Sequence, residues 1–398
     1  MSTRDVWANV VGQPDAVAVL RAAAAAAAAL VDGKPVAPAA MTHAWLFTGP
    51  PGSGRSVAAR AFAAALQCVA GIGCGQCPGC RTTLVGTHAD VRLVVPEGLS
   101  ISVAEMRALV QAAARRPTGG RWQVVVIEDA DRLTEGAANA LLKAVEEPPA
   151  RTVFLLCAPS DHPEDVSVTI RSRCRGIALR TPSVPAVAKV LIERDGVDEP
   201  IARWAASVCG GHVGRARRLA TDPAARDRRA AVLRVPVGLR GPADVFTCAD
   251  DLVNAAESEA TTLSETRDIA EREALETAMG AGGTGKGTAA ATRGAKGALK
   301  ELERRQKSRA TRTQRDALDL ALIDLAGFYR DVLVTSYGSD AARFHPDRAE
   351  DMAAAAKSWS RESILRRLEA VLACRQAIEL NVKPRIAVEA MLTALYHG

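Results

Sequence analysis

The sequence has few aromatic side chains, no long apolar run and no apolar leader at its start. Phe, Trp and Tyr make up 4% of 398 residues, while alanine, the best helix former, is abundant, which favours helices. The longest apolar run, Ala22–Val31, is ten residues long, whereas about 20 are needed to cross a bilayer, so we expect no membrane span. Because residues 1–7 lack the apolar core of a signal peptide, we expect a cytoplasmic chain whose nine cysteines are thiols or metal ligands rather than disulfides.

Positive charge is concentrated in one segment. The formal net charge is +6, and ten basic residues against Glu301 and Glu303 give residues 286–315 a charge of 10 − 2 = +8, which leaves 6 − 8 = −2 elsewhere. The glycine-rich stretch 279–287 before it is typical of a flexible loop. The basic segment lacks interleaved aromatics, so a solvated basic helix, a contact with the DNA backbone and a contact with a protein partner stay open.

Apolar patterns divide the chain into three regions. Residues 1–182 alternate strand and helix patterns, which predicts an α/β domain with a parallel sheet. Strands are expected at 44–48, 90–95, 123–127, 152–156 and 176–180. Three of them are nearly continuous apolar runs, as in central strands covered on both faces. We expect a small helical lid over 183–221 and a helical collar domain over 222–398, with a glycine-rich and basic insertion at about 279–315.

A phosphate-binding loop follows the first expected strand. Gly49-Pro-Pro-Gly52-Ser-Gly54-Arg55-Ser56 opens a helix expected to run through residues 58–68. Glycines let backbone N–H groups point at one anion, and Ser56 is placed to ligate Mg²⁺ of bound ATP or ADP. The motif normally has Lys where this chain has Arg55, and the two are not interchangeable. A degenerate nucleotide site that binds poorly is therefore an open alternative.

Carboxylates end the strand at 123–127. At this place P-loop NTPases hold a metal-associated Asp, often followed by a Glu that polarises the attacking water. Here the order is Glu128 and then Asp129, which shifts the carboxylate oxygens by about an ångström, enough to impair in-line chemistry. The pair is a candidate part of the nucleotide site, and a local acidic cap is the alternative.

Four cysteines form a compact metal-binding pattern. Cys68, Cys74, Cys77 and Cys80 are spaced C-x5-C-x2-C-x2-C, with glycines and a proline between them that allow tight turns. Four thiolates suit a closed, tetrahedral, structural Zn²⁺ site. An iron–sulfur cluster and free thiols remain alternatives. Cys157, Cys209, Cys248 and Cys374 are expected to be buried apolar residues.

The order of these motifs resembles that in the AAA+ subunits of the bacterial DNA polymerase III clamp loader. The motifs are Val10-Val-Gly-Gln13, the P-loop, the four cysteines, Gly86-Thr-His-Ala-Asp90, Asn139-Ala-Leu-Leu-Lys-Ala-Val-Glu-Glu-Pro-Pro149 and Ile170-Arg-Ser-Arg-Cys174. The resemblance covers residues 1–221 and implies an AAA+ fold. Because the P-loop and the acidic pair are altered, the chain is most similar to the delta-prime, or stator, type of subunit.

The resemblance also implies site residues. Arg173 matches the arginine finger that a clamp-loader subunit presents to ATP bound by a neighbour, and the four cysteines match the family's zinc ligands. Ser160 lies near the position of the first sensor residue. Gly214, beside Arg215, stands at the second sensor position, which argues against autonomous hydrolysis.

The implied function is clamp loading in DNA replication. Delta and gamma/tau subunits would be the partners in a hetero-pentameric assembly that places the sliding clamp on primed DNA, using ATP hydrolysed by the neighbours. The chain would be part of a DNA polymerase holoenzyme without being a polymerase, and a weak or inactive ATPase. An ATP-hydrolysing motor subunit and an unrelated zinc-containing nucleic-acid-binding module are the alternatives.

Overall fold

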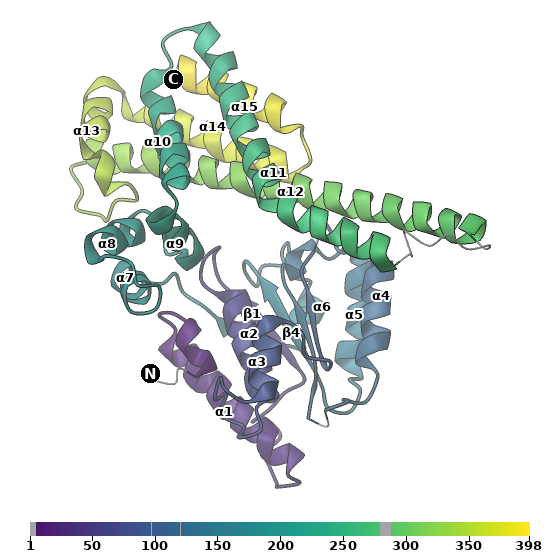
Figure 1. The fold of residues 1–398 in the computed structure, drawn as a ribbon. Coiled ribbons are helices and arrows are strands. Elements are labelled where there is room, and N and C mark those ends of the chain that lie inside the picture. Colours follow the sequence, from purple (N-terminus) through teal and green to yellow (C-terminus); the bar gives the residue numbers. More distant parts are fainter. Residues whose placement is uncertain (1–4, 97, 120, 279–287) are drawn as a thin grey trace. The chain divides into compact units, whose positions relative to one another are not determined.

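The computed structural model describes residues 5–96, 98–119, 121–278 and 288–398, and the side chains of 276–296 lie outside the described residues. The chain forms two compact units, Met1–Thr221 and Asp222–Gly398 (Figure 1). The expected flexible loop at 279–287 lies outside the described residues. The division of the first unit into an AAA+ domain and a lid stays a prediction.

The first unit is built on a five-stranded parallel sheet. Its strands are β1 (Ala44–Thr48), β2 (Val91–Val94), β3 (Gln123–Ile127), β4 (Thr152–Ala158) and β5 (Arg175–Ala178), in the order β2-β3-β4-β1-β5. The three apolar runs are the central strands β1, β3 and β4, and their side chains are almost entirely buried. The predicted parallel α/β fold is therefore confirmed, with strand ends shifted by one or two residues at β2, β4 and β5.

Alternate residues of the central strands enter two separate cores. On one face Trp45, Val124 and Leu155 pack with residues of α1 (Pro14–Val31) and α2 (Arg55–Leu66). On the other face Leu46 and Val125 pack with residues of α4 (Val103–Ala113) and α5 (Glu135–Glu146). Helices thus cover both faces, which explains why these strands are apolar at nearly every position.

Helix α1 is long and apolar enough, by length and composition, to cross a membrane. The longest apolar run did not indicate this, because Asp15 and Arg21 interrupt the helix sequence without making it polar overall. A core helix has the same composition, and Leu20, Ala23 and other residues of α1 lie in the first core.

Short elements connect and complete this unit. They are η1 (Val6–Asn9), α3 (Pro78–Val85), η2 (Ala130–Arg132), α6 (Val168–Arg171), α7 (Val184–Glu193), α8 (Glu199–Ser207) and α9 (Val213–Thr221). The last three lie within residues 183–221, the region expected to be a small helical lid.

The second unit is helical throughout its described residues. Its elements are α10 (Pro223–Gly238), α11 (Pro242–Ala278), α12 (Thr288–Ser336), η3 (Pro346–Arg348), α13 (Ala349–Ser358), α14 (Arg361–Glu379) and α15 (Pro384–His397). Buried residues recur on α12 at a helical spacing, as in Leu318, Leu322, Leu325, Tyr329 and Val332, and form one core with the other helices.

Helices α11 and α12 form a long antiparallel pair (Figure 1). Towards their connected ends, polar contacts replace the apolar core. The Arg309 guanidinium lies 2.5 Å from Asp268 and 2.6 Å from Glu271, and the Gln306 amide donates to the Asp268 carbonyl oxygen at 3.0 Å. Hydrogen bonds from Arg309 hold the pKa of Glu271 at about 2. Part of the basic segment is therefore neutralised by α11, so of the three alternatives a wholly solvated helix does not describe this part.

A buried polar network lies in the second unit around His345. Its Nδ1 accepts from the Arg229 guanidinium at 2.8 Å, and its Nε2 donates to the Asp324 carbonyl oxygen at 2.9 Å. Its backbone N–H donates to Asp331, and Arg229 also makes two bonds to Asp347. These contacts favour the neutral imidazole, because a second proton, on Nδ1, would point at the Arg229 guanidinium.

We expect the free energy of unfolding to decrease as the pH falls and His345 takes up a proton. Burial, and then Arg229, lower the pKa of His345 against the opposing effect of Asp324. Between the ordinary value of about 6.5 and the lower folded value, the unfolded state binds a proton that the folded state does not. The folded chain should therefore lose stability as the pH falls from 7.5 to 5.5, by about 1.4 kcal/mol for each unit by which the folded pKa is lowered within this range.

Denaturant unfolding at the two pH values checks this expectation. His345→Gln should be less stable at pH 7.5 and show a smaller pH-dependent loss, whereas substitution of the exposed His397 should leave the loss unchanged. Equal losses in the native chain and in His345→Gln would contradict the expectation.

Candidate functional site

The P-loop joins β1 to α2, as the sequence predicts. The Gly49 N–H donates to the Pro159 carbonyl oxygen at 3.1 Å, so the start of the loop is held by the segment after β4. Gly52 has φ = +87°, and a Cβ built there would lie 2.7 Å from the His212 Cβ. Only glycine fits at this position, because His212 lies directly against the loop. Ser56 is the second residue of α2.

Arg55 is turned back onto the loop itself. Its Nη1 donates to the Gly49 carbonyl oxygen at 2.7 Å. In a working P-loop the basic residue at this position reaches the β- and γ-phosphates. The guanidinium instead bonds to the loop's own backbone, which differs from that phosphate contact.

The acidic pair lies at the end of β3, at the same sheet edge as the P-loop. Glu128 Oε1 accepts from the Arg60 guanidinium at 2.7 and 3.0 Å. Asp129 adopts a left-handed conformation, with φ = +53°, and starts η2. Arg60 on α2 therefore already binds the carboxylate that would act on water.

The expected sensor residues make local contacts. The Ser160 hydroxyl donates to Asp165 at 2.5 Å, within the turn after β4. The Arg215 N–H donates to His212 Nδ1 at 3.2 Å, and Gly214 also lies beside that ring.

The four cysteines lie together beside α2. Their Sγ atoms are all within 4.8 Å of one another, so this cluster can hold a metal ion. A tetrahedral Zn–S distance of about 2.3 Å corresponds to sulfurs about 3.8 Å apart, which fits this spacing. Cys68 and Cys80 are buried, and Cys74 and Cys77 are partly exposed.

Backbone N–H groups prepare the thiols as ligands. The N–H groups of Cys74, Cys77 and Cys80 each donate to the sulfur of the preceding cluster cysteine, at 3.4–3.5 Å. Burial opposes ionisation of Cys68, but backbone donors outweigh it and lower its pKa to about 6. Burial raises the pKa of Cys80. Thiolates are the species that bind metals, so the N–H donors favour coordination.

The module is fixed to the rest of the unit. The Val6 N–H donates to the Gly73 carbonyl oxygen at 3.0 Å, and Trp7 Nε1 donates to the Ile72 carbonyl oxygen at 3.0 Å. Cys77 caps α3, so the helix N-terminus also favours a thiolate at this end.

Arg173 follows α6 and is partly exposed. Its Nη2 lies 2.8 Å from Glu146 Oε1, and its Nη1 donates to the Thr169 carbonyl oxygen at 3.0 Å. Glu146 ends α5 within the Glu-Glu-Pro-Pro sequence. Two motifs that are separate in the sequence therefore meet, because Glu146 of the Glu-Glu-Pro-Pro motif binds the Arg173 guanidinium of the Ser-Arg-Cys motif.

Residues 34–183 match the family described as DNA polymerase III, delta subunit. The delta' subunit of Bacillus subtilis is 32% identical over 197 residues, which cover 49% of this chain and 59% of that protein. The delta' subunit of Pseudomonas aeruginosa is 38% identical over 163 residues, or 40% of this chain and 49% of that protein. The matched segment is therefore similar to delta' subunits. The chain thus spans about half the length of the delta' relatives that it matches.

Other subunits of DNA polymerase III are also similar to this chain. The tau/gamma subunit of Haemophilus influenzae is 35% identical over 171 residues, which cover 42% of this chain and 23% of that protein. A DNA polymerase III gamma-subunit-related protein of Thermotoga maritima aligns over 89% of this chain and 94% of that chain, with 14% identity and a TM-score of 0.38. This structural similarity is too low to add to the argument. The observed parallel sheet is the feature that agrees with the fold implied by the resemblance.

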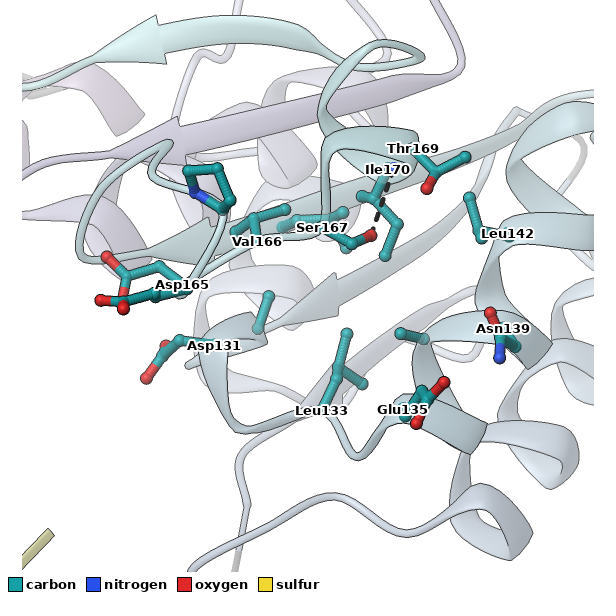
Figure 2. Close-up of a pocket in the computed structure, with 15 residues that line it drawn as sticks. Asp131, Leu133, Glu135, Asn139, Leu142, Asp165, Val166, Ser167, Thr169 and Ile170 are labelled. Atoms are coloured by element: carbon teal, nitrogen blue, oxygen red, sulfur yellow. Dashed lines mark hydrogen bonds between the residues drawn. The ribbon is translucent and has the colours of Figure 1, made fainter. Parts of the chain in front are cut away.

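A cavity of about 390 Å³ lies beside α6, lined by η2, α5, the turn after β4, and α6 (Figure 2). Its lining contains Asp131, Glu135, Glu164 and Asp165, and no Lys or Arg. Asp131 Oδ1 is buried without a hydrogen-bond partner, and burial, together with Asp129, raises the pKa of this carboxyl group. The cavity therefore favours a positively charged group over an anion.

Sequence reasoning missed the side chains that restrain the expected site residues. Arg60, Glu146 and His212 contact Glu128, Arg173 and Gly52, respectively. Glu146 lies inside a motif that the resemblance included, so it could have been singled out. The sequence gives one indication for Arg60, which is its position on the helix that follows the P-loop.

Proposed function

We propose that this chain is a delta-prime, non-hydrolysing subunit of a DNA polymerase III clamp loader and acts in DNA replication. Its partners would be delta and gamma/tau subunits in a hetero-pentameric, cytoplasmic assembly. That assembly would place the sliding clamp on primed DNA with ATP hydrolysed by the neighbouring subunits. The delta-prime match over residues 34–183 supports the family part of the proposal.

The contact between Arg55 and the Gly49 carbonyl oxygen carries the proposal that the chain does not hydrolyse ATP. Gly49, Gly52, Gly54, Arg55, Ser56, Glu128 and Asp129 would then form a degenerate nucleotide site. The Arg60–Glu128 ion pair supports the same conclusion, because it engages the carboxylate that would act on water.

We expect the isolated chain to bind MgATP with a Kd of about 1 mM or weaker, because the loop's basic residue is used internally. Titration calorimetry measures this value. Arg55→Lys, which introduces the usual P-loop residue, should tighten binding, whereas Lys34→Ala on the exposed surface should not change it. A micromolar Kd for the native chain would contradict a degenerate site.

We further propose that Arg173 is an arginine finger for ATP bound by a neighbour, and that Glu146 positions it. A guanidinium at this place would stabilise negative charge on the transferring phosphoryl group. The surface ion pair with Glu146 is partly exposed, so it exchanges readily for a stronger phosphate contact.

The cysteine cluster would hold Zn²⁺ as a structural ion. Four protein ligands leave no open position for substrate, so the ion would stabilise the fold of residues 68–80 without taking part in a reaction. An iron–sulfur cluster would instead give a coloured protein that contains iron.

Affinity purification of the tagged chain from its source cell, followed by mass spectrometry, tests the assignment. Recovery of delta, gamma/tau and polymerase subunits is the expected result. Their absence from a preparation that recovers other stable complexes would contradict it. The similarity to tau/gamma subunits keeps one competing function, an ATP-hydrolysing motor subunit.

A further inference from the structure

Within the basic segment, one face of α12 contacts α11 and the opposite face is exposed. Arg309 and Gln306 face α11, as their contacts with Asp268 show. Lys307 precedes Arg309 by two residues, which corresponds to about 200° around a helix, so it lies on nearly the opposite side. Pairing with α11 therefore does not neutralise the far face.

Lys300, Arg304 and Lys307 form a basic stripe on that far face. Their spacing of four and three residues places them on one side of the helix, and all three are exposed. Arg304 is 78% exposed and pairs with Glu301, which is 53% exposed. An exposed pair of this kind is worth little, so Arg304 can exchange Glu301 for a phosphate.

The same spacing continues towards the start of α12. Arg293 and Lys296 precede Lys300 by seven and four residues in the sequence. Their side chains lie outside the described residues, so the inference rests on Lys300, Arg304 and Lys307.

The composition of the stripe favours a nucleic-acid backbone over a protein. Residues 288–315 contain no aromatic residue and no methionine, so the face lacks the aromatic anchors that dominate protein interfaces. It also lacks the stacking surface that single-stranded DNA requires. Exposed, evenly spaced cations are sufficient for a phosphate backbone, which is bound through charge without base recognition.

We propose that the Lys300–Arg304–Lys307 stripe binds the phosphate backbone of double-stranded DNA without sequence preference. This contact goes beyond the proposed clamp-loader role, in which DNA is reached through the complex. It does not depend on that role, because it would be made by this chain alone.

Fluorescence anisotropy of a labelled 20-base-pair duplex, titrated with the full-length chain at several salt concentrations, tests the proposal. The test variant is Lys300→Ala/Arg304→Ala/Lys307→Ala, which keeps good helix formers throughout. Each phosphate contact contributes about 0.9 to the slope of log affinity against log salt, so the triple variant should flatten the slope by about 2.7. Its affinity at low salt should fall by at least tenfold.

A matched control removes three exposed cations elsewhere. Lys34, Lys189 and Arg203 are 68%, 69% and 71% exposed and lie in the first unit. Their triple alanine variant should bind the duplex with the native affinity and slope. Equal binding by the native chain and the stripe variant would overturn the proposal. So would equally tight binding of poly-glutamate of the same charge, because that would indicate an acidic protein as the partner.

Discussion

Replacing Cys77 by Ser should abolish zinc binding and sharply lower the thermal stability of the first unit. The native chain should contain one zinc ion, because four sulfurs within 4.8 Å of one another form a closed ligand set. Structural zinc contributes an apparent 10–16 kcal/mol in small zinc-dependent folds, roughly the whole stability of a typical domain. Loss of the ion should therefore unfold at least the segment between α2 and α3.

Metal analysis by mass spectrometry and calorimetric unfolding measure the two effects. Cys248→Ser is the matched control, since Cys248 is a partly buried thiol on α11, outside the cluster. It should keep its zinc and lose little stability. A Cys77→Ser chain with a full complement of zinc, or a native chain that contains iron, would show that the metal assignment is wrong.

Replacing Arg173 by Ala should reduce ATP turnover at the neighbouring site by about 10³-fold, the lower end of the effect of an arginine finger. The measurement requires a reconstituted clamp loader in which the other motor sites carry inactivating P-loop substitutions. Assembly should be unchanged, because Arg173 contacts only partly exposed or exposed groups. Glu146→Gln should give a smaller loss, because it removes the charge that positions Arg173 and leaves the finger itself.

Arg171 provides the control for the finger. It lies two residues before Arg173, is similarly exposed and donates to the Asp161 carbonyl oxygen. Arg171→Ala should leave turnover nearly native. If Arg171→Ala and Arg173→Ala lowered turnover equally, the loss of turnover would reflect general surface charge. That result would contradict a specific role for Arg173.

The sheet and the cysteine cluster could be predicted because local patterns determine them. The apolar runs at β1, β3 and β4 indicated strands covered on both faces, and the close cysteine spacing brings the sulfurs together within one short segment. Cys157, Cys209 and Cys374 are buried as expected, whereas Cys248 is only partly buried because it lies near the exposed side of α11.

Long-range polar contacts could not be predicted in the same way. The Arg60–Glu128 and Arg309–Asp268 pairs join residues 68 and 41 positions apart. An arginine has many possible carboxylate partners in the sequence, so tertiary packing selects among them. These contacts matter for function, since one engages a carboxylate of the nucleotide site and the other neutralises part of the basic segment.

Steady-state ATP hydrolysis by the purified chain alone tests most directly whether this chain is a non-hydrolysing subunit. We expect no turnover above that of a chain carrying Ser56→Ala, because Arg55 and Glu128 are both engaged within the protein. Addition of the gamma/tau subunit should produce turnover that depends on Arg173. Hydrolysis by the isolated chain at about 1 s⁻¹ or faster, a rate within the usual enzyme range, and its loss on Glu128→Gln would instead identify a motor subunit.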